Sequence, residues 1–476
     1  MKGMTPEAMA KACDGQLISC DKILGREVTA VITDSRKTVP GAAFVAIRGE
    51  RADGHTFVKA VLEAGAMLAV VEEVPADPDT PCILVKSTLL AIQRIAGLYR
   101  EKLGIPVVGV TGSVGKTSTK EAIAAVLGAK YRVLKTAGNF NNNLGLPLTV
   151  FRLTEEDEIA VLEMGISHFG EMEELARTAR PDVMVVTNIG TCHLEFLGDR
   201  DGIFRAKTAC FPYVRDGGEI ILNYEDDKLT QVTPEKMRGL RQQPALENAR
   251  VAGPTFYGFS EGAEVRAKDI VTHGLAGSSF AICMDGREIP VRLALPGRHM
   301  ILNALAAAAV GRHFGLSDAE IKEGLAALKP LGGRVNIVET PFGTVIDDCY
   351  NASPASVKAA LDLLASVPGR KTAILGDMGE LGKNERALHR EVGVHAGQLP
   401  IDTFLLAGKL TEETAEGIRG VRPDAKILHF PDTETLLKAL PENLERGGSI
   451  LVKASHFMGF DRVVNKTLQA ASEPNT

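Results

Sequence analysis

The sequence contains no tryptophan, and aromatic residues make up only 5% of its 476 positions. It also lacks an excess of positive charge: the formal net charge is -6 at pH 7, whereas binding to nucleic-acid phosphates needs a basic surface. Long apolar runs are missing too, since the most apolar helical stretch, 300–310, is far shorter than a bilayer span and includes Asn303. We therefore expect neither nucleic-acid binding nor a membrane span.

Cysteine is scarce and scattered. The seven cysteines are odd in number and never form a C-x-x-C pair, which argues against a disulfide framework and against a zinc site built from thiolates. The first residues, MKGMTPEAMAKACDGQ, have no apolar segment of the kind found in secretory signals. These absences predict a cytoplasmic protein, and we expect a monomer that binds small molecules.

The chain does contain a regular alternation of apolar strand-like runs and helical segments. It is too long for one hydrophobic core, and we predict three α/β domains, at 1–103, 104–330 and 331–476. In the second domain, continuous apolar strands separated by helices predict a buried parallel sheet with helices on both faces. The third domain repeats the pattern as a smaller Rossmann-like unit without a G-x-G-x-x-G fingerprint.

A glycine-rich loop, VVGVTGSVGKTSTKEAI, joins an expected strand to an expected helix at the start of the second domain. The usual phosphate-loop spacing would place its first glycine at the position of Val110. A lysine at a helix N-terminus, here Lys116, opposes the helix dipole and therefore indicates a bound anion. Backbone N–H groups can bind phosphate oxygens, and a threonine hydroxyl can bind Mg²⁺. We predict a nucleotide phosphate site rather than a plain turn, formed by Gly112, Ser113, Val114, Gly115, Lys116, Thr117 and Ser118.

Two further side chains follow apolar strands of the same domain. Glu163 ends the run IAVLE, and His193 comes just after the run DVMVVTNI. Because ligands bind at the carboxyl ends of parallel strands, we expect both to lie near Thr117. The alternatives are a helix-capping role for Glu163 and a structural role for His193.

Asparagines crowd the segment GNFNNNLGLP. Asparagine tolerates turn conformations, so a plain loop would explain several of them. As a binding loop, however, they would offer donors and acceptors to a ligand, and functional loops lie at strand ends. Asn139, Asn141 and Asn142 are therefore candidate binding residues, and the family resemblance described below implies that they form a substrate loop.

Several long segments together are similar to the Mur ligases. They are TGSVGKTS, GNFNNNLGLPLTVF, VLEMGISHFGEMEELARTARPDVMVVTNIGTCHLEFLG, DDCYNASPASVKAAL and LGDMGELG. The block at 33–66 resembles the UDP-sugar-binding domain of this family. The resemblance implies an ATP- and Mg²⁺-dependent ligase that joins a carboxylate to an amine through an acyl phosphate. Within the family, the motifs are most similar to members that add D-alanyl-D-alanine to UDP-N-acetylmuramoyl-tripeptide for peptidoglycan synthesis.

The resemblance also implies roles for individual residues. It implies catalytic roles for Lys116, His193 and Lys207, and metal binding by Thr117, Glu163, His193 and a carbamylated Lys207. It places Asn303, Arg334 and Asp348 around ATP, and Tyr350 and Asn351 beside the substrates. Ser35 and Arg36 become candidates for the uridine diphosphate end, since arginine suits phosphate geometry, although Arg36 could equally be a solvent-facing loop residue. Met300 departs from the family, where many members have asparagine, and a buried Asn303 requires a partner that a purine could supply.

Two other functions are alternatives to this one. A different amide ligase of the same superfamily is disfavoured, because the Asp-Asn-Pro-Arg signature of the diaminopimelate-adding members is absent and folylpolyglutamate synthetases lack such an N-terminal block. A P-loop NTPase that acts as a switch would not need a carboxylate, a histidine and a lysine at one sheet edge. The identity of the third peptide residue, diaminopimelate or lysine, stays open. Three surfaces must converge on one carboxyl group, which predicts domain closure with a hinge at 331–333.

Overall fold

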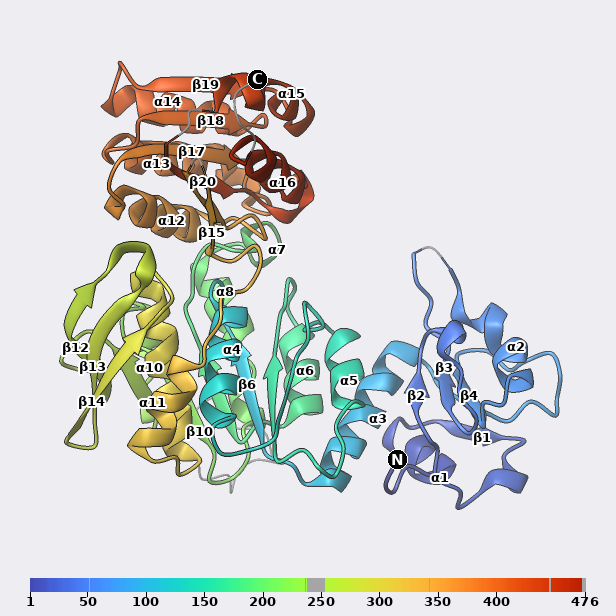
Figure 1. Ribbon diagram of the computed structural model, residues 1–476. Coiled ribbons are helices and arrows are strands. Elements are labelled where there is room, and N and C mark those ends of the chain that lie inside the picture. Colours follow the sequence, from blue (N-terminus) through green and yellow to red (C-terminus); the bar gives the residue numbers. More distant parts are fainter. Residues whose placement is uncertain (51, 236, 238–252, 342, 445–446, 473–476) are drawn as a thin grey trace.

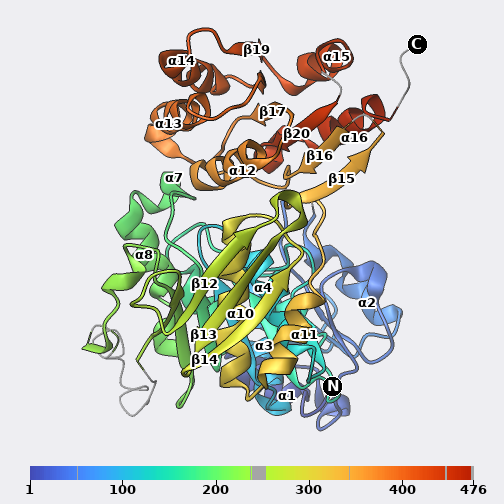
Figure 2. The same cartoon turned by 60° about the vertical axis from the view of Figure 1, so that its left-hand side comes forward.

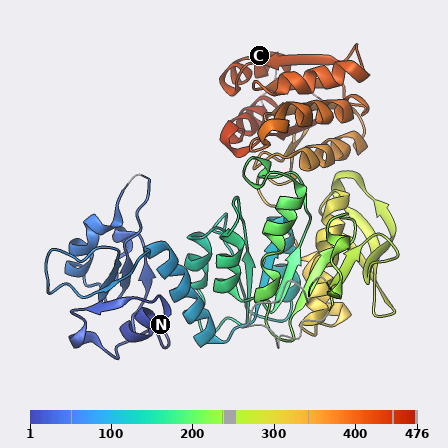
Figure 3. The ribbon, with the colours of Figure 1, turned by 180° about the vertical axis from the view of Figure 1, so that it is seen from behind.

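The computed structural model describes residues 1–50, 52–235, 237, 253–341, 343–444 and 447–472. It contains three β-sheets, each combined with helices, which confirms the predicted α/β class (Figure 1). The N-terminal and C-terminal sheets lie on different sides of the central one, as the view from behind also shows (Figure 3). Within the described residues, no helix is both long and apolar enough to cross a membrane.

The N-terminal sheet has five strands in the order β1-β5-β4-β3-β2, and only β1 is antiparallel to its neighbour. Its strands are β1 (Gln16–Ile18), β2 (Val31–Ile32), β3 (Ala43–Val45), β4 (Leu68–Val71) and β5 (Cys82–Leu84), with helices α1 (Pro6–Ala12) and α2 (Val58–Glu63). Helix α3 (Thr88–Leu103) follows, capped by Ser87 at its start and ended by Gly104 in the left-handed conformation. It contacts β4 as well as helices α5 and α6 of the central unit, so a domain boundary at residue 103 stays a prediction.

The central sheet has nine strands in the order β14-β13-β12-β11-β10-β9-β6-β8-β7. The strands from β7 (Val133–Lys135) to β12 (Val265–Thr272) in this order are parallel, as the apolar runs predicted. Between these two in the sheet lie β8 (Ile159–Glu163), β6 (Val107–Thr111), β9 (Val183–Val186), β10 (Glu219–Asn223) and β11 (Thr255–Gly258).

An antiparallel extension of this sheet was not anticipated. Strands β13 (Ser278–Met284) and β14 (Arg287–Leu293) pair with β12 in an antiparallel meander that stands at the front of Figure 2. Alternate residues of β13 are buried, so its sequence shows the period of two rather than a continuous apolar run. Such short alternating strands give a weaker sequence signal than the buried parallel ones.

Helices cover both faces of the central sheet. One hydrophobic core packs α4 (Lys116–Leu127), α10 (Arg298–His313) and α11 (Asp318–Ala326) against it. The opposite core packs α3 together with α5 (Gly145–Val150), α6 (Glu171–Ala179) and α8 (Arg200–Thr208). Neighbouring residues of β6 face opposite cores, with Val107 in one and Val108 and Val110 in the other. The strand that carries the glycine-rich loop is therefore the buried centre of the molecule.

The C-terminal sheet has six strands in the order β15-β16-β20-β17-β18-β19, parallel except for the edge strand β15. The strands are β15 (Asn336–Thr340), β16 (Gly343–Asp347), β17 (Arg370–Gly376), β18 (Thr403–Ala407), β19 (Lys426–Phe430) and β20 (Gly448–Lys453). Helices α12 (Pro354–Ser366), α13 (Glu385–Gly397) and α14 (Thr411–Val421) cover one face, and α15 (Thr433–Asn443) and α16 (Asp461–Ala470) cover the other. This is the predicted doubly wound arrangement.

The linker into this unit contains the predicted hinge. Gly333 has a φ of 70° and is tied to the C-terminal sheet, since its N–H donates to Asp347 and its carbonyl accepts from the Tyr350 N–H. At Gly332, an added Cβ would meet no described atom within 4 Å. The hinge at 331–333 stays a prediction.

Candidate active site

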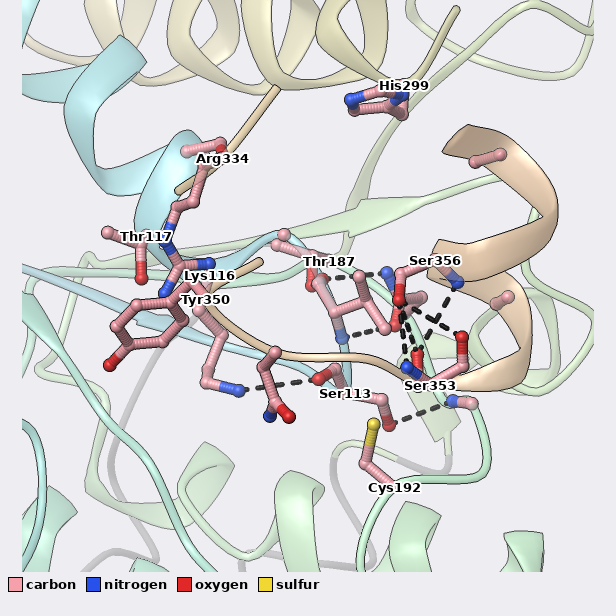
Figure 4. Close-up of a pocket in the computed structure, with 18 of the residues that line it drawn as sticks. Ser113, Lys116, Thr117, Thr187, Cys192, His299, Arg334, Tyr350, Ser353 and Ser356 are labelled. Atoms are coloured by element: carbon pink, nitrogen blue, oxygen red, sulfur yellow. Dashed lines mark hydrogen bonds between the residues drawn. The ribbon is translucent and has the colours of Figure 1, made fainter. Parts of the chain in front are cut away.

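A cavity of about 740 Å³ lies between the central and C-terminal units (Figure 4). Its walls come from the carboxyl ends of β6, β8 and β9, from the first turns of α4 and α10, and from the segment that leads into α12. Many of the residues singled out in the sequence line it together: Ser113, Val114, Gly115, Lys116, Thr117, Ser118, Asn139, Asn141, Asn142, Glu163, His193, Asn303, Arg334, Asp348, Tyr350 and Asn351. Residues that are far apart in the sequence, from the central and C-terminal units, thus meet around one space.

Four other predicted residues do not line this cavity. Gly112 packs against Thr187, and Lys207 is fully buried and does not line the cavity. Ser35 and Arg36 belong to the N-terminal unit, where Arg36 has a side chain that is 87% exposed and forms a two-point ion pair with Asp34. That guanidinium lowers the pKa of the Asp34 carboxyl to about 2. Their assignment to the uridine diphosphate end stays a prediction.

The irregular spacing of the glycine-rich loop has a packing cause. Gly112 has a φ of 144°, and a Cβ on it would lie 1.9 Å from Thr187 Oγ1, so the turn needs glycine at this position. Val110, at the position where the usual pattern has glycine, is fully buried in the core under α4. Gly109 packs against the opposite core, where an added Cβ would lie 2.7 Å from Met184 Sδ.

The loop is fastened to the segment after β9. The side-chain amide of Asn188 makes two hydrogen bonds to Val114, accepting from its N–H at 2.9 Å and donating to its carbonyl at 2.9 Å. The backbone N–H of Ser113 donates to the carbonyl of Asn188 at 3.0 Å, and Ser113 Oγ accepts from the N–H of Gly190 at 2.9 Å. Asn188 was not predicted, although its place after an apolar strand was the signal used for His193. These bonds hold the loop in one shape.

Lys116 begins α4, as expected. The helix has no side-chain N-cap, because its N-cap residue is Gly115 in the left-handed conformation. The N–H groups of its first turn and the ammonium of Lys116 are thus all placed at the cavity. Lys116 Nζ lies 3.0 Å from the carbonyl oxygen of Gly112 and 3.4 Å from that of Ser113. This arrangement can receive a polyphosphate.

Replacing Gly112 with alanine is expected to weaken nucleotide binding more than replacing Gly115. Both glycines have positive φ, and a left-handed backbone costs an L-residue about 1–2 kcal/mol. Only at position 112 does the new Cβ also collide with protein, whereas at position 115 its nearest neighbour, Asn303 Oδ1, is 3.7 Å away. Titration calorimetry with ADP should show at least about a tenfold larger loss for Gly112→Ala, which corresponds to 1.4 kcal/mol. Equal losses in the two variants would contradict this account of the spacing.

Glu163 is buried at the end of β8, and its two carboxylate oxygens have different surroundings. Oε1 accepts a hydrogen bond from Asn141 Nδ2 at 2.8 Å. Oε2 has no hydrogen-bond partner among the described residues, and Lys120 Nζ lies 3.9 Å away. A buried carboxylate oxygen without a donor is costly unless a cation completes it. The helix-capping alternative is not observed, because α6 starts later, after its N-cap Gly170.

The asparagine loop divides into structural and cavity-facing members. Asn142 Oδ1 accepts from the N–H groups of Leu144 and Gly145 and so fixes the entry into α5. Asn141 holds Glu163, as described above. Asn139 is exposed and lines the cavity. The plain-loop alternative thus explains the hydrogen bonds of Asn142. The binding role of all three asparagines stays a prediction.

Lys207 lies on α8, and its side chain is 0% exposed. Nζ has no hydrogen-bond partner among the described residues. Burial, followed by the nearby positive charge of Lys116, lowers the pKa of Lys207 from 10.5 to about 7. The amine is therefore substantially neutral and nucleophilic near neutral pH, unlike an exposed lysine.

His193 immediately precedes the short helix α7 (Leu194–Leu197) and lines the cavity. Its Nδ1 lies 2.6 Å from Oε2 of Glu380, a residue of the C-terminal unit that the sequence analysis did not single out. A structural histidine could make the same contact, so the metal-binding role of His193 stays a prediction. The contact connects the two units at the edge of the cavity.

The expectation for Asn303 needs correction. Its side chain already has protein partners: Oδ1 accepts from Thr119 Oγ1 at 2.9 Å, and Nδ2 lies 3.3 Å from Met300 Sδ. The buried amide thus does not require a purine. The sequence could not show this, because Thr119 is 184 positions away from Asn303. Asn303 still lies beside Gly115, so contact with a nucleotide stays a prediction.

The C-terminal wall carries a buried ion pair that the sequence analysis missed. Lys453 Nζ lies 2.5 Å from Asp348 Oδ2 and donates to the carbonyl of Asn351 at 3.0 Å. Arg334 stacks on the ring of Tyr350, with 4.1 Å from the guanidinium carbon to the ring centroid. Lys453 ends the apolar strand SILVK, so the strand-end pattern that indicated Glu163 would also have found it.

The oxygen donors of the cavity are limited in number. Among the described residues, no three His, Cys, Asp or Glu side chains cluster closely enough to hold a metal ion by themselves. The unpartnered oxygen of Glu163 and the hydroxyl of Thr117, which line the same cavity, nevertheless suit a hard, oxygen-preferring cation such as Mg²⁺. An ion here would need further oxygen ligands from a bound phosphate or from a modified side chain.

Comparison with known proteins identifies relatives along nearly the whole chain. Residues 110–311 match the Mur ligase middle domain, 333–456 the Mur ligase glutamate ligase domain, and 27–115 the Mur ligase family catalytic domain. The UDP-N-acetylmuramoyl-tripeptide–D-alanyl-D-alanine ligase of Bacillus subtilis (strain 168) is 39% identical, with 93% of this chain and 94% of that protein covered. Its counterpart from Escherichia coli (strain K12) is 35% identical, with 98% of each covered.

Solved structures give the same result. A crystal structure of MurF from Acinetobacter baumannii superposes with a TM-score of 0.87 at 30% identity and covers 98% of this chain and 99% of that one. MurF ligase from Thermotoga maritima in complex with ADP superposes with a TM-score of 0.78 at 30% identity, covering 93% and 97%. The similarity thus extends over all three sheets.

Proposed function

Because this chain belongs to the Mur ligase family, we propose that it adds D-alanyl-D-alanine to UDP-N-acetylmuramoyl-tripeptide at the expense of ATP. The product would be the UDP-pentapeptide precursor of bacterial peptidoglycan. One observation carries the proposal: the cavity brings Lys116 and Thr117 of the central unit face to face with Arg334 and Asp348 of the C-terminal unit. The names of the similar ligases support this choice of substrates.

The reaction has two steps that the cavity suits. A carboxylate oxygen of the tripeptide attacks the γ-phosphorus of ATP, the bond to the β-phosphate oxygen breaks, and an acyl phosphate and ADP form. The amine nitrogen of D-alanyl-D-alanine then attacks the acyl carbon, the carbon–oxygen bond to phosphate breaks, and the nitrogen loses a proton as phosphate leaves. Both steps depend on positioning and on neutralising negative charge rather than on a nucleophilic side chain.

The chain's own residues have distinct tasks in these steps. Lys116 and the first N–H groups of α4 hold the β- and γ-phosphates, while the guanidinium of Arg334 offers positive charge from the opposite wall. Asn303 and Asp348 contact the nucleoside. Closure of the two walls keeps water away from the acyl phosphate.

Magnesium fits the same edge of the central sheet. Thr117, Glu163, His193 and a carbamylated Lys207 would hold it, and the bound ion neutralises phosphate charge. Carbamylation is supported by the state of Lys207: a neutral buried amine can attack CO₂, forming an N–C bond and releasing a proton. The resulting carbamate replaces an unpartnered amine with anionic oxygens that suit a hard cation.

The remaining surfaces would hold the other ends of the substrates. Ser35 and Arg36 bind the uridine diphosphate end on the N-terminal unit, and the loop with Asn139, Asn141 and Asn142 binds the sugar-peptide. Tyr350 and Asn351 lie near the acceptor. We place the enzyme in the cytoplasm, because all its substrates are soluble metabolites. We further propose that it acts as a monomer.

Mass spectrometry of the products tests the proposal directly. The protein is incubated with ATP, Mg²⁺, D-alanyl-D-alanine and either the diaminopimelate- or the lysine-containing UDP-tripeptide. We expect a UDP-pentapeptide and stoichiometric ADP, and the preferred tripeptide identifies the third residue. ADP release that does not depend on D-alanyl-D-alanine, without a new peptide, would contradict the proposal and favour the NTPase switch.

A further inference from the structure

Glu380 lies next to the active-site residue His193, in a loop with an unusual backbone conformation. It follows β17 in the C-terminal unit and has a φ of 60°, a left-handed conformation that is uncommon for a residue with a side chain. Its partner His193 also adopts a left-handed conformation, with a φ of 61°. Two such residues facing each other indicate that the contact is built into both segments, because each costs backbone free energy.

The surrounding backbone keeps the two segments together. The N–H of Glu195 donates to the carbonyl oxygen of Glu380 at 3.4 Å. A Cβ on Gly382, which has a φ of 59°, would come within 3.1 Å of the Glu195 backbone, so the close approach of this loop to α7 favours glycine. The chain thus fixes Glu380 next to His193 through main-chain contacts rather than through the two side chains alone.

The side chains meet at hydrogen-bond distance. His193 Nδ1 is 2.6 Å from Glu380 Oε2, although the ring N–H is not aligned well enough with the oxygen to form a full hydrogen bond. His193 is 21% exposed and Glu380 is 50% exposed.

A contact this exposed contributes little stability by itself, since even a full ion pair at the surface is typically worth about 0–1 kcal/mol. A stabilising role therefore does not explain two strained backbones. A carboxylate beside Nδ1 instead favours the tautomer that carries its proton on this nitrogen, which leaves the Nε2 lone pair available. Histidines that bind metals commonly use such a carboxylate on their second nitrogen.

We propose that Glu380 is a positioning residue that orients His193 for metal binding across the boundary between the central and C-terminal units. This rests on the proposed function, which makes His193 a Mg²⁺ ligand. The orienting group belongs to the C-terminal unit, so the metal site is complete only when that unit is docked. By linkage, metal binding in turn favours the docked arrangement.

Metal affinity, measured separately from turnover, tests the proposal. Mn²⁺ is titrated into the full-length protein with a non-hydrolysable ATP analogue, and free Mn²⁺ is followed by electron paramagnetic resonance. We expect Glu380→Gln to weaken one Mn²⁺ site about 10–100-fold, as losing such a carboxylate does elsewhere. Glu385→Gln, which removes an exposed carboxylate a few positions along the same unit, should leave it unchanged. In turnover, Glu380→Gln should raise the Mg²⁺ concentration for half-maximal rate and recover most of its kcat at saturating Mg²⁺.

His193→Ala makes the outcomes distinguishable. If His193→Ala weakens Mn²⁺ binding and Glu380→Gln does not, the positioning role is overturned while the metal role of His193 stands. If neither variant changes Mn²⁺ binding, both roles are overturned. Synthesis of the UDP-pentapeptide by the unaltered protein reports on the ligase function independently of all these results.

Discussion

Replacing Lys116 with alanine is expected to leave a folded protein whose turnover is lower by at least about 10²–10³-fold, the usual effect of removing one preorganised donor to developing charge. The lysine places its ammonium beside the carbonyls of Gly112 and Ser113, where the phosphates would lie. The loop itself should persist, because Asn188 and Ser113 hold it through bonds that do not involve Lys116.

Quantifying ADP and UDP-pentapeptide at saturating substrates measures this loss, and the melting temperature confirms that the variant is folded. Lys59→Ala is a suitable control, since that side chain is 89% exposed on the N-terminal unit. Unimpaired ligation by Lys116→Ala would refute the assignment of the loop to the ATP phosphates.

Removal of Lys207 is expected to have an effect of comparable size. The alanine variant loses the proposed carbamate, and with it an anionic ligand for the metal. Added formate or acetate should restore part of the rate in Lys207→Ala by supplying carboxylate oxygens in the space that the side chain leaves. The same anions should not rescue Lys116→Ala, because that site needs a cation. Failure of every short carboxylate to rescue, together with an unmodified lysine in the mass of the native protein, would overturn the carbamate.

The carbamate should also depend on pH in a defined direction. Carbamate forms only from the neutral amine, and the pKa of Lys207 is lowered from 10.5 to about 7. Incorporation of ¹³C-bicarbonate, followed by NMR at constant dissolved CO₂, should therefore rise as the pH increases through about 7. An exposed lysine would show this rise only near its ordinary pKa. Incorporation that is flat between pH 6 and 8 would contradict the buried neutral amine.

The residues that the sequence placed correctly share one property: local pattern was sufficient to locate them. Lys116 begins a helix directly after an apolar strand, and Glu163 ends another such strand, so each position follows from the order of elements. In a parallel sheet the carboxyl ends of all strands lie at one edge, and this geometric rule brings the two together without any knowledge of side-chain packing. Their roles in binding, however, are still predictions.

The residues that the sequence missed or misjudged depend on contacts between distant segments. Asn303 was expected to need a partner that a purine could supply, yet Thr119 and Met300 already satisfy its amide. Lys453 lines the cavity from the end of β20, and Glu380 contacts the cavity residue His193, so both act from the C-terminal sheet. No periodicity or motif encodes such a meeting, since it results from how whole units pack.

The sequence by itself determined the three α/β units, the strand–loop–helix that can hold phosphates, and the family to which the chain belongs. These follow from hydrophobic periodicity and from the order of short motifs, both of which are local in the chain. Only the tertiary structure decided why glycine stands at 112 rather than 110, which polar groups already have partners, and which residue faces His193. Each of those answers depends on the distance between atoms that are far apart in sequence, such as Gly112 and Thr187 or His193 and Glu380, and packing alone sets such distances.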